Sequence, residues 1–388
     1  MLTKAETDLL TDLQSAHAGA DPLNLVIITD IGRDHDDEVA LLVTRGLEKL
    51  GLVKLCGVVA NFSRDDGRAR LAKGALQAIG AGAVPVAVGA NDNPHEPVRD
   101  YELSASYLAA PEEVEPDGQI LLKRLFSDAQ KSGETLDLVL ISGMTDARDF
   151  IRDNVELSRQ VIGHVNIMGG VESENGQPRP DSHGHLRPDS AYNNCIDKHL
   201  NADPQADPVG PSAKDLYHLL QAQGIPTRIV TRFAAYATAV TPQFYDDLAA
   251  GGHPVASRIR QFQKSSLEHL WRDIQSGTMG PRLTPDWFCQ TFCTQPHQAL
   301  KALQDDPGAS PWPHVGRLML YDPVTVLAAV MPPRAGLLAP WVHKVAKDDG
   351  SGDGIEHQVI GISDDTAGLD HPAHWSSLMA ALTKLACS

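Results

Sequence analysis

Cysteine and long apolar stretches are both scarce in this sequence. Its 388 residues include five cysteines, with no CxxC pair among them, which argues against a disulfide framework and against a cysteine zinc cluster. No apolar run approaches the about 18 residues needed to cross a bilayer. Residues 1–23 also contain no apolar run of signal-peptide length. We therefore expect a cytoplasmic protein with no membrane partner.

Positive charge is in deficit as well. Lysine and arginine number 33 against 50 aspartates and glutamates, which gives a formal net charge of -17. Such a field repels phosphate backbones and anionic lipid, so we expect no nucleic-acid partner, although a local basic pocket could still bind one small anion. The remaining composition, 42% hydrophobic and 21% charged residues, is typical of a globular protein.

Short apolar runs alternate with amphipathic stretches through the first 230 residues. The runs predict strands at Leu25–Thr29, Lys54–Ala60, Val84–Val88, Leu136–Ser142, Val161–Met168 and Thr227–Thr231. Several are unbroken, as expected of strands covered on both faces. The stretches between them predict helices at about 37–50, 65–79, 118–131, 145–153 and 213–223. This alternation predicts an α/β fold with a mostly parallel, Rossmann-like open sheet flanked by helices.

The second half is less regular. Helical patterns occur near 241–250, 254–275, 296–304 and 323–331, and residues 171–190 and 201–212 have the composition of long loops. A capping box in the first residues predicts an N-terminal helix within 1–23, and we expect a hairpin and a helix over 336–388. With no internal repeat and no clear linker, we predict a single domain over 1–388.

Acidic residues crowd the segment that follows the first predicted strand. Five acids occur within nine residues, namely Asp30, Asp34, Asp36, Asp37 and Glu38. A solvated helix start, favoured by the helix dipole, explains two acids but not five, because like charges this close repel. Clustered oxygen ligands suit a hard cation. In an open parallel sheet, ligands bind beyond the carboxyl ends of the strands, so we predict a site for a hard cation such as Ca²⁺ or Mg²⁺ here.

Further polar motifs follow other predicted strands or helices. They are Val58-Val59-Ala60-Asn61, Ser142-Gly143-Met144-Thr145-Asp146, Met168-Gly169-Gly170, Ala191-Tyr192-Asn193-Asn194-Cys195-Ile196-Asp197 and Leu320-Tyr321-Asp322-Pro323. Taken in this order with the acidic segment, they resemble the inosine–uridine-preferring nucleoside hydrolase family, over residues of about 24–335.

The spacing within the acidic segment is similar to one subgroup of that family. The family's usual spacing from its first retained Asp to its Asp-Asp pair is four and five residues, whereas Asp30 lies six and seven residues before Asp36 and Asp37. This longer form resembles the nucleoside-hydrolase-like subgroup that includes type III effectors of plant-pathogenic bacteria. Ile28, Ala191 and Tyr321 stand where the family has Asp, Glu and often His.

The resemblance implies roles for individual residues. It implies a Ca²⁺ ion, with Mg²⁺ as the less favoured ion, held by Asp30, Asp37, Asp322 and the carbonyl of Thr145. Asp34 is a possible replacement for Asp30. It implies ribose binding by Asp36, Asn61, Tyr192, Asn193 and Asp322. Asp30 is the candidate base for a water molecule, and Tyr321 takes the position of the acid for the leaving base. His35, Tyr192 or Tyr236 could serve as that acid instead.

Two functions from different classes follow from the resemblance. The first is a Ca²⁺-dependent hydrolase that cleaves the N-ribosidic bond of a nucleoside or nucleoside-like compound, as in purine or pyrimidine salvage. The alternative is a hydrolase-like binding protein that captures a ribosylated ligand with little or no turnover. The family also implies a homo-oligomer, either a dimer or a tetramer.

A basic stretch follows the second predicted strand. Arg64, Arg68, Arg70 and Lys73 alternate there with Asp65 and Asp66. At helical spacing this pattern predicts an exposed, salt-bridged helix face, with a phosphate clamp as the less favoured alternative.

Overall fold

The structure is a computed structural model. It describes residues 2–62, 65–91, 98–99, 101–189, 211–277, 279, 283–331, 337–345 and 354–388.

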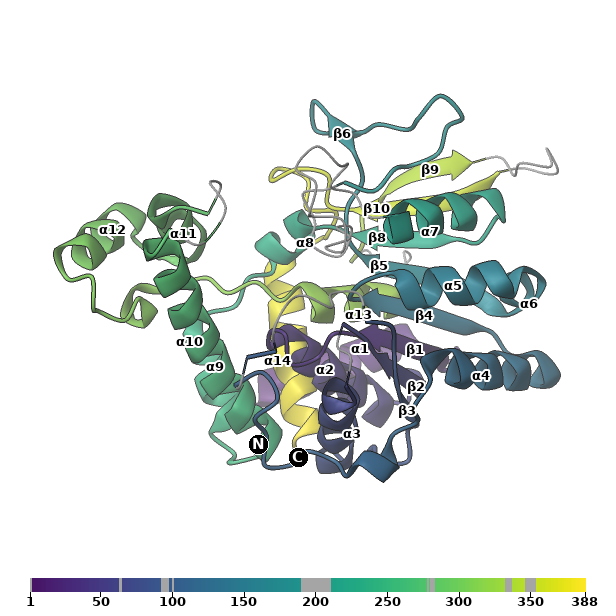
Figure 1. The fold of residues 1–388 in the computed structure, drawn as a ribbon, viewed down its shortest axis with the longest axis horizontal. Helices are drawn as coiled ribbons and strands as arrows, with labels where there is room; N and C mark the ends of the chain where they lie inside the picture. The colour runs from purple at the N-terminus through teal and green to yellow at the C-terminus, as the bar shows by residue number, and fades with distance from the viewer. Residues whose placement is uncertain are drawn as a thin grey trace.

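An eight-stranded sheet forms the centre of the molecule, in the order β3-β2-β1-β4-β5-β8-β10-β9 (Figure 1). Its neighbouring strands run parallel, except for the antiparallel pair β10 and β9. The strands are β1 Leu23–Thr29, β2 Val53–Ala60, β3 Val86–Val88, β4 Leu136–Ile141, β5 Ile162–Met168, β8 Thr227–Val230, β9 Trp341–Val345 and β10 Ile355–Ile360. The predicted mostly parallel sheet is therefore confirmed.

Strand β1 shows why its sequence is an unbroken apolar run. Leu25 and Ile27 face one hydrophobic core, whereas Val26 and Ile28 face the other. A strand covered on both faces has no polar side to alternate with. The pairing register places Thr29 beside Ala60 of β2 and Ile141 of β4. The polar residues that follow these three strands therefore meet at one edge of the sheet.

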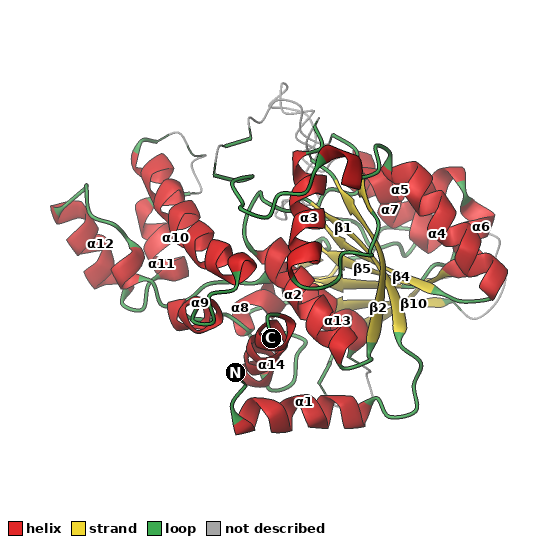
Figure 2. Cartoon of the chain, turned by 90° about the horizontal axis from the view of Figure 1, so that it is seen from below, coloured by secondary structure: helices red, strands yellow, loops and turns green. Residues whose placement is uncertain are grey.

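Helices cover the sheet in two layers (Figures 1 and 2). One layer contains α4 Gly118–Ser132, α5 Thr145–Asp153, α6 Val155–Val161 and α7 Pro211–Ala222. The other contains α1 Lys4–Ala16, α2 Asp36–Lys49, α3 Gly67–Ala78, α13 Tyr321–Val330 and α14 Pro372–Ala386. Within the described residues, the structure contains no helix with the length and apolarity that a membrane span needs.

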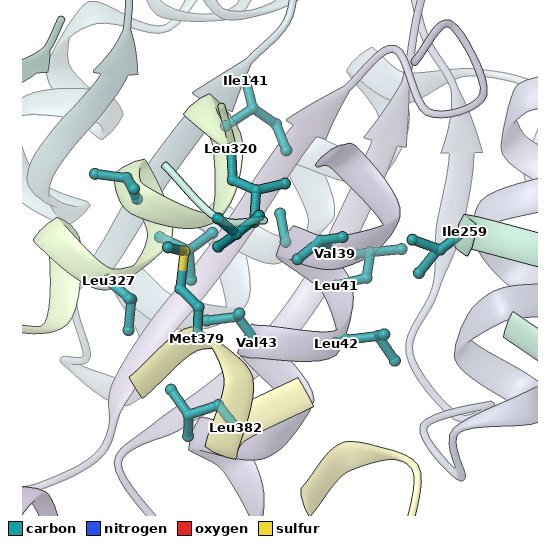
Figure 3. Close-up of a cluster of buried hydrophobic side chains, with 14 of the residues drawn as sticks. Val39, Leu41, Leu42, Val43, Ile141, Ile259, Leu320, Leu327, Met379 and Leu382 are labelled. Atoms are coloured by element: carbon teal, nitrogen blue, oxygen red, sulfur yellow. The ribbon is translucent and has the colours of Figure 1, made fainter. Parts of the chain in front are cut away.

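Helix α2 lies in the middle of its layer, between the sheet, α13 and α14. Figure 3 shows its Val39 and Val43 in one buried cluster with Leu327 of α13 and Met379 of α14. Gly46 brings α2 and α14 into close contact, because a Cβ atom there would lie 2.5 Å from the carbonyl oxygen of Leu382. Since α2 begins at the acidic segment, this packing fixes the position of that segment.

A helical lobe extends to one side of the sheet (Figure 1). It comprises α9 Pro242–Ala249, α10 Pro254–Gln275, α11 Pro285–Phe292 and α12 Pro296–Asp305, with α8 Arg232–Ala237 at its base. The lobe shares its hydrophobic core with the α2 layer. Short 3-10 turns occur at Pro111–Glu113 and Trp312–His314.

Most predicted elements occur within a few residues of their expected bounds. The N-terminal helix α1 has the expected capping box between Thr3 and Glu6. The sequence analysis does not predict α6, α8 or α11, each of eight residues or fewer. The predicted loop 171–190 also contains a small hairpin, β6 Ser173–Glu174 and β7 Gln177–Pro178. The predicted loop 201–212 lies almost entirely outside the described residues.

The prediction that the basic residues lie on an exposed helix face was wrong for Arg68. Its side chain is buried and donates to the carbonyl oxygens of Asp30 and Ile31 at 3.1 and 3.0 Å. It also pairs with Glu102 at 2.8 Å. The partner of Arg68 comes from a distant loop, so the local charge pattern could not reveal it.

Candidate functional site

The chain turns sharply between β1 and α2. Gly32 adopts a φ of 91°, and a Cβ atom at this position would lie 2.7 Å from the Glu102 carbonyl oxygen. Both conditions favour glycine. The turn carries the acidic segment past the end of the sheet, and α2 begins at Asp36.

Four carboxylates meet at this turn. Asp34, Asp36, Asp37 and Asp322 each offer an oxygen atom, and these atoms lie within 4.8 Å of one another. We call these four residues the acidic cluster. Asp36, Asp37 and Asp322 are buried, whereas Asp34 is exposed at the edge. Asp36 and Asp37 belong to the first turn of α2 and Asp322 to that of α13, so the positive ends of two helix dipoles point at the cluster.

Hydrogen bonds satisfy part of the cluster. Asp36 Oδ2 accepts from the backbone N–H groups of Tyr321 and Asp322, at 3.0 and 3.4 Å. Asp37 Oδ1 accepts from the hydroxyl of Thr29. Among the described residues, Asp37 Oδ2 and Asp322 Oδ1 are buried without a hydrogen-bond partner. Buried oxygens of this kind are costly unless a proton or a cation compensates them.

Protonation is one form of compensation. Burial, reinforced by the charge of Asp34, raises the pKa of Asp36 well above its usual range. Burial and the charge of Asp30 do the same for Asp37, and burial and the charge of Asp36 for Asp322. Partial loss of solvent around the Asp34 carboxylate acts in the same direction, but a hydrogen bond from Asp36 and the nearby charges of His35 and Arg33 outweigh it and lower the pKa of Asp34.

A divalent cation is the other form of compensation. The donors are oxygens only, which suits Ca²⁺ or Mg²⁺ rather than zinc or copper. Two of the four residues carry a buried oxygen with no hydrogen-bond partner in the described structure. The residues present therefore fit a hard divalent ion.

Asp30 lies next to the cluster but is not one of its four members. It is buried, with 9% of its surface exposed. Burial and the charge of Asp34 raise the pKa of Asp30 to about 6, against the opposing charges of Arg33 and Arg68. The structure thus brings Asp36 into the group of possible ligands, whereas the sequence assigned Asp36 to ribose and Asp30 to the metal.

Asn61 and Thr145 lie on the neighbouring strand ends. Asn61 is buried, and its Nδ2 donates to the Gly143 carbonyl and to Asp146 Oδ2, both at 3.1 Å. Thr145 is the first residue of α5, and its hydroxyl lies 2.9 Å from that of Ser212. Asp146 also accepts from the N–H of Ala90. It therefore ties the ends of β2, β3 and β4 together, a role the sequence analysis did not assign.

The candidate acids have different surroundings. Burial and the neighbouring Tyr236 raise the pKa of Tyr321 well above its usual value. Burial lowers the pKa of His35 to about 4, and His35 Nε2 lies 2.6 Å from the hydroxyl of Tyr245. At neutral pH the tyrosine holds its proton tightly and the histidine is a neutral imidazole, so both are weak general acids. Tyr192 and Asn193 lie outside the described residues.

Comparison with known proteins identifies the family of this chain. No family model and no curated protein matched it. Among solved structures, the type III effector protein XopQ, in complex with adenosine diphosphate ribose, matches over 100% of both chains, with 31% identity and a TM-score of 0.80. The effector protein XOO4466 matches over the same extent, with 30% identity and a TM-score of 0.77. The chain belongs to this nucleoside-hydrolase-like family of effector proteins.

Nucleoside hydrolases share the fold of the effector family. A purine-preferring ribonucleoside hydrolase from Gardnerella vaginalis matches over 94% of this chain and 99% of its own, with 16% identity and a TM-score of 0.55. The predicted fold class and the predicted effector subgroup are both confirmed.

Proposed function

We propose that this member of the effector family binds Ca²⁺ at the acidic cluster and hydrolyses the N-ribosidic bond of a nucleoside or nucleoside-like compound. The observation that carries the proposal is the convergence of Asp34, Asp36, Asp37 and Asp322 at the carboxyl edge of a parallel sheet. The complex of XopQ with adenosine diphosphate ribose supports a ribosylated ligand. The fold shared with a ribonucleoside hydrolase supports the reaction class.

The four carboxylates of the acidic cluster would hold the ion, with Asp30 and the Thr145 carbonyl as further ligands. When bound, such an ion orders a sugar diol and lowers the pKa of a nearby water. Asn61 and Asn193 would position the ribose hydroxyls, together with Asp36, Tyr192 and Asp322.

Asp30 is the proposed base. A carboxylate with a pKa of about 6 holds a proton more firmly than an ordinary aspartate and is still ionised at neutral pH. The water oxygen bonds to C1′ while its proton passes to Asp30. The C1′–N bond breaks, and its electron pair leaves with the base, as in other reactions with an oxocarbenium-like transition state. Tyr321 remains the proposed acid.

The alternative is a protein that captures a ribosylated ligand with little or no turnover. The raised pKa of Tyr321 and the lowered pKa of His35 favour it, because both weaken the candidate acids at neutral pH. The cytoplasmic location, the homo-oligomer and a salvage role stay predictions.

One experiment tests both functions. The purified protein is desalted, its metal content is measured, and a nucleoside panel is assayed for released reducing sugar with Ca²⁺ at several pH values. We expect retained Ca²⁺ and sugar release, and loss of both in Asp37→Asn. Asp137→Asn is the matched control, because Asp137 is a buried carboxylate at the opposite end of the sheet.

The outcomes separate the two functions. Retained Ca²⁺ and riboside binding without sugar release would support the binding protein. A wild-type protein that retains no divalent ion and binds no riboside would contradict both.

A further inference from the structure

A cavity lies between α8 and the end of α11 in the helical lobe. Its volume is about 460 Å³, within the roughly 300–1,000 Å³ of small-molecule sites. Its lining comes from α8, from the end of α11, from residues 317–319 and from the turn that holds Asp364. We call it the lobe pocket.

The lobe pocket adjoins the acidic cluster through two tyrosines. Tyr236 lines the pocket, and its ring centroid lies 6.3 Å from that of Tyr321. The backbone N–H of Tyr321 donates to Asp36 in the cluster. A ligand whose ribose lies at the cluster therefore needs to extend past one aromatic side chain to reach the pocket.

The walls of the lobe pocket combine aromatic and polar groups. Phe233 and Tyr236 supply aromatic surface, and Gln290, Arg317 and Asp364 supply donors and acceptors at the rim. Phosphate would be attracted by the guanidinium but repelled by the carboxylate. A heterocyclic base has flat faces and an edge with both donors and acceptors, and it matches this lining better.

Arg317 is fixed in this position by its backbone. Its N–H donates to the Phe292 carbonyl at 3.1 Å, and the next residue, Leu318, pairs with Val240. Its Nη2 donates to the Tyr236 carbonyl at 3.4 Å. No ion pair of Arg317 with an acid occurs among the described residues, so its other N–H groups can donate to a ligand.

We propose that the lobe pocket binds the heterocyclic base of the ribosylated ligand, with Tyr236 stacking on the ring and Arg317 donating to its acceptor atoms. The inference rests on the proposed function, since the ribose must lie at the acidic cluster. It assigns base selection to α8, α11 and residues 317–319, outside the motifs that gave the family resemblance.

Calorimetry with Ca²⁺ present tests the proposal. The probes are ribose, ribose 5-phosphate, free adenine, and formycin A, an adenosine analogue whose carbon–carbon link cannot be hydrolysed. We expect wild type to bind formycin A at least about tenfold more tightly than ribose. Tyr236→Ala should weaken formycin A binding roughly 5- to 100-fold, the usual range for loss of one base stack, and leave ribose binding unchanged.

Arg317→Gln is the second variant, and it changes an exposed side chain. It should also weaken formycin A alone, whereas Arg272→Gln, an exposed arginine on α10, should change nothing. The inference is overturned if formycin A binds no more tightly than ribose, or if its tighter binding is the same in Tyr236→Ala. It is also overturned if the variants weaken the binding of ribose 5-phosphate alone. Adenine binding that depends on Tyr236, with no binding of ribose, would support the base site and contradict the proposed function.

Discussion

Glu38 and Asp37 are neighbours in the first turn of α2, yet they belong to two very different groups of buried charges. Glu38 pairs with Arg258 of α10, and Arg258 also donates to the backbone of Glu102, whose side chain pairs with Arg68. We call these four residues the paired network. Asp37 belongs to the acidic cluster, whose four members are all aspartates.

The difference separates structural charge from functional charge. In the paired network each carboxylate has a guanidinium partner, so burial is compensated within the chain. In the acidic cluster, two buried oxygens have no hydrogen-bond partner among the described residues, and burial together with neighbouring carboxylates raises the pKa values of Asp37 and Asp322. Buried acids of the second kind indicate a ligand from outside the chain.

The largest expected effect on stability comes from removing a guanidinium from the paired network, which leaves a buried carboxylate without a cationic partner, as in the acidic cluster. Arg258→Met leaves Glu38 buried and unpaired, and we expect it to lower the free energy of unfolding by about 3–5 kcal/mol in denaturant titrations. Arg260→Met on the same helix is the control. Arg260 pairs with Asp246 at the surface, so its loss should cost at most about 1 kcal/mol. Equal losses in the two variants would contradict the distinction.

The reverse change supplies a cation to the acidic cluster. Ca²⁺ at about a thousandfold its dissociation constant should stabilise wild type by about 4 kcal/mol, because the ion binds only the folded state. Asp37→Asn should show almost none of this gain in thermal unfolding, whereas Asp137→Asn should keep it. The same gain in Asp37→Asn would show that the ion binds elsewhere.

The dependence of stability on pH tests Asp137, a buried carboxyl near the amino ends of the strands, away from the acidic cluster. Burial raises the pKa of Asp137 from 3.8 to about 6. The folded state then holds a proton that the unfolded state has lost, so stability from this group is full below about pH 4 and falls as the pH rises through about 6. The shift corresponds to about 3 kcal/mol.

Asp137→Asn removes this titration. Wild type should therefore lose more unfolding free energy than the variant between pH 4 and pH 7, measured by denaturant titration without divalent ions. Parallel pH curves for the two proteins would rule out the raised pKa.

The smallest expected effect concerns Thr29, whose hydroxyl donates to Asp37. Thr29→Val removes this bond, and we expect roughly tenfold weaker Ca²⁺ binding by calorimetry, as is usual for a group that orients a ligand. Thr44→Val is the matched control, because Thr44 is also buried and its hydroxyl donates to the Ala40 carbonyl instead. If both variants bind Ca²⁺ like wild type, Thr29 does not orient Asp37.

The sequence was sufficient for much of the sheet because strands such as β1 and β4 are short, largely apolar runs that are mostly or fully buried. It was also sufficient to bring Asp37 and Asp322 into one hypothesis, through motif order. It could not show which carboxylate oxygens lie together, so it assigned Asp36 to ribose, whereas the structure places Asp36 among the four carboxylates of the acidic cluster.

Contacts between residues far apart along the chain were missed. Arg68 depends on Glu102, and Arg317 and Tyr236 meet only through the placement of the lobe. No local pattern carries such pairings, because they arise from tertiary packing rather than from propensity.

The bond between Asp36 and the N–H of Tyr321 joins residues 285 positions apart. While the ribosome is still making the protein, Asp36 leaves the exit tunnel long before its donor exists. Helix α2 must also wait for α14, which packs against it at Gly46. The nascent chain therefore completes its acidic turn only near the end of translation, so an incomplete product would lack the assembled site although all of its early aspartates are present.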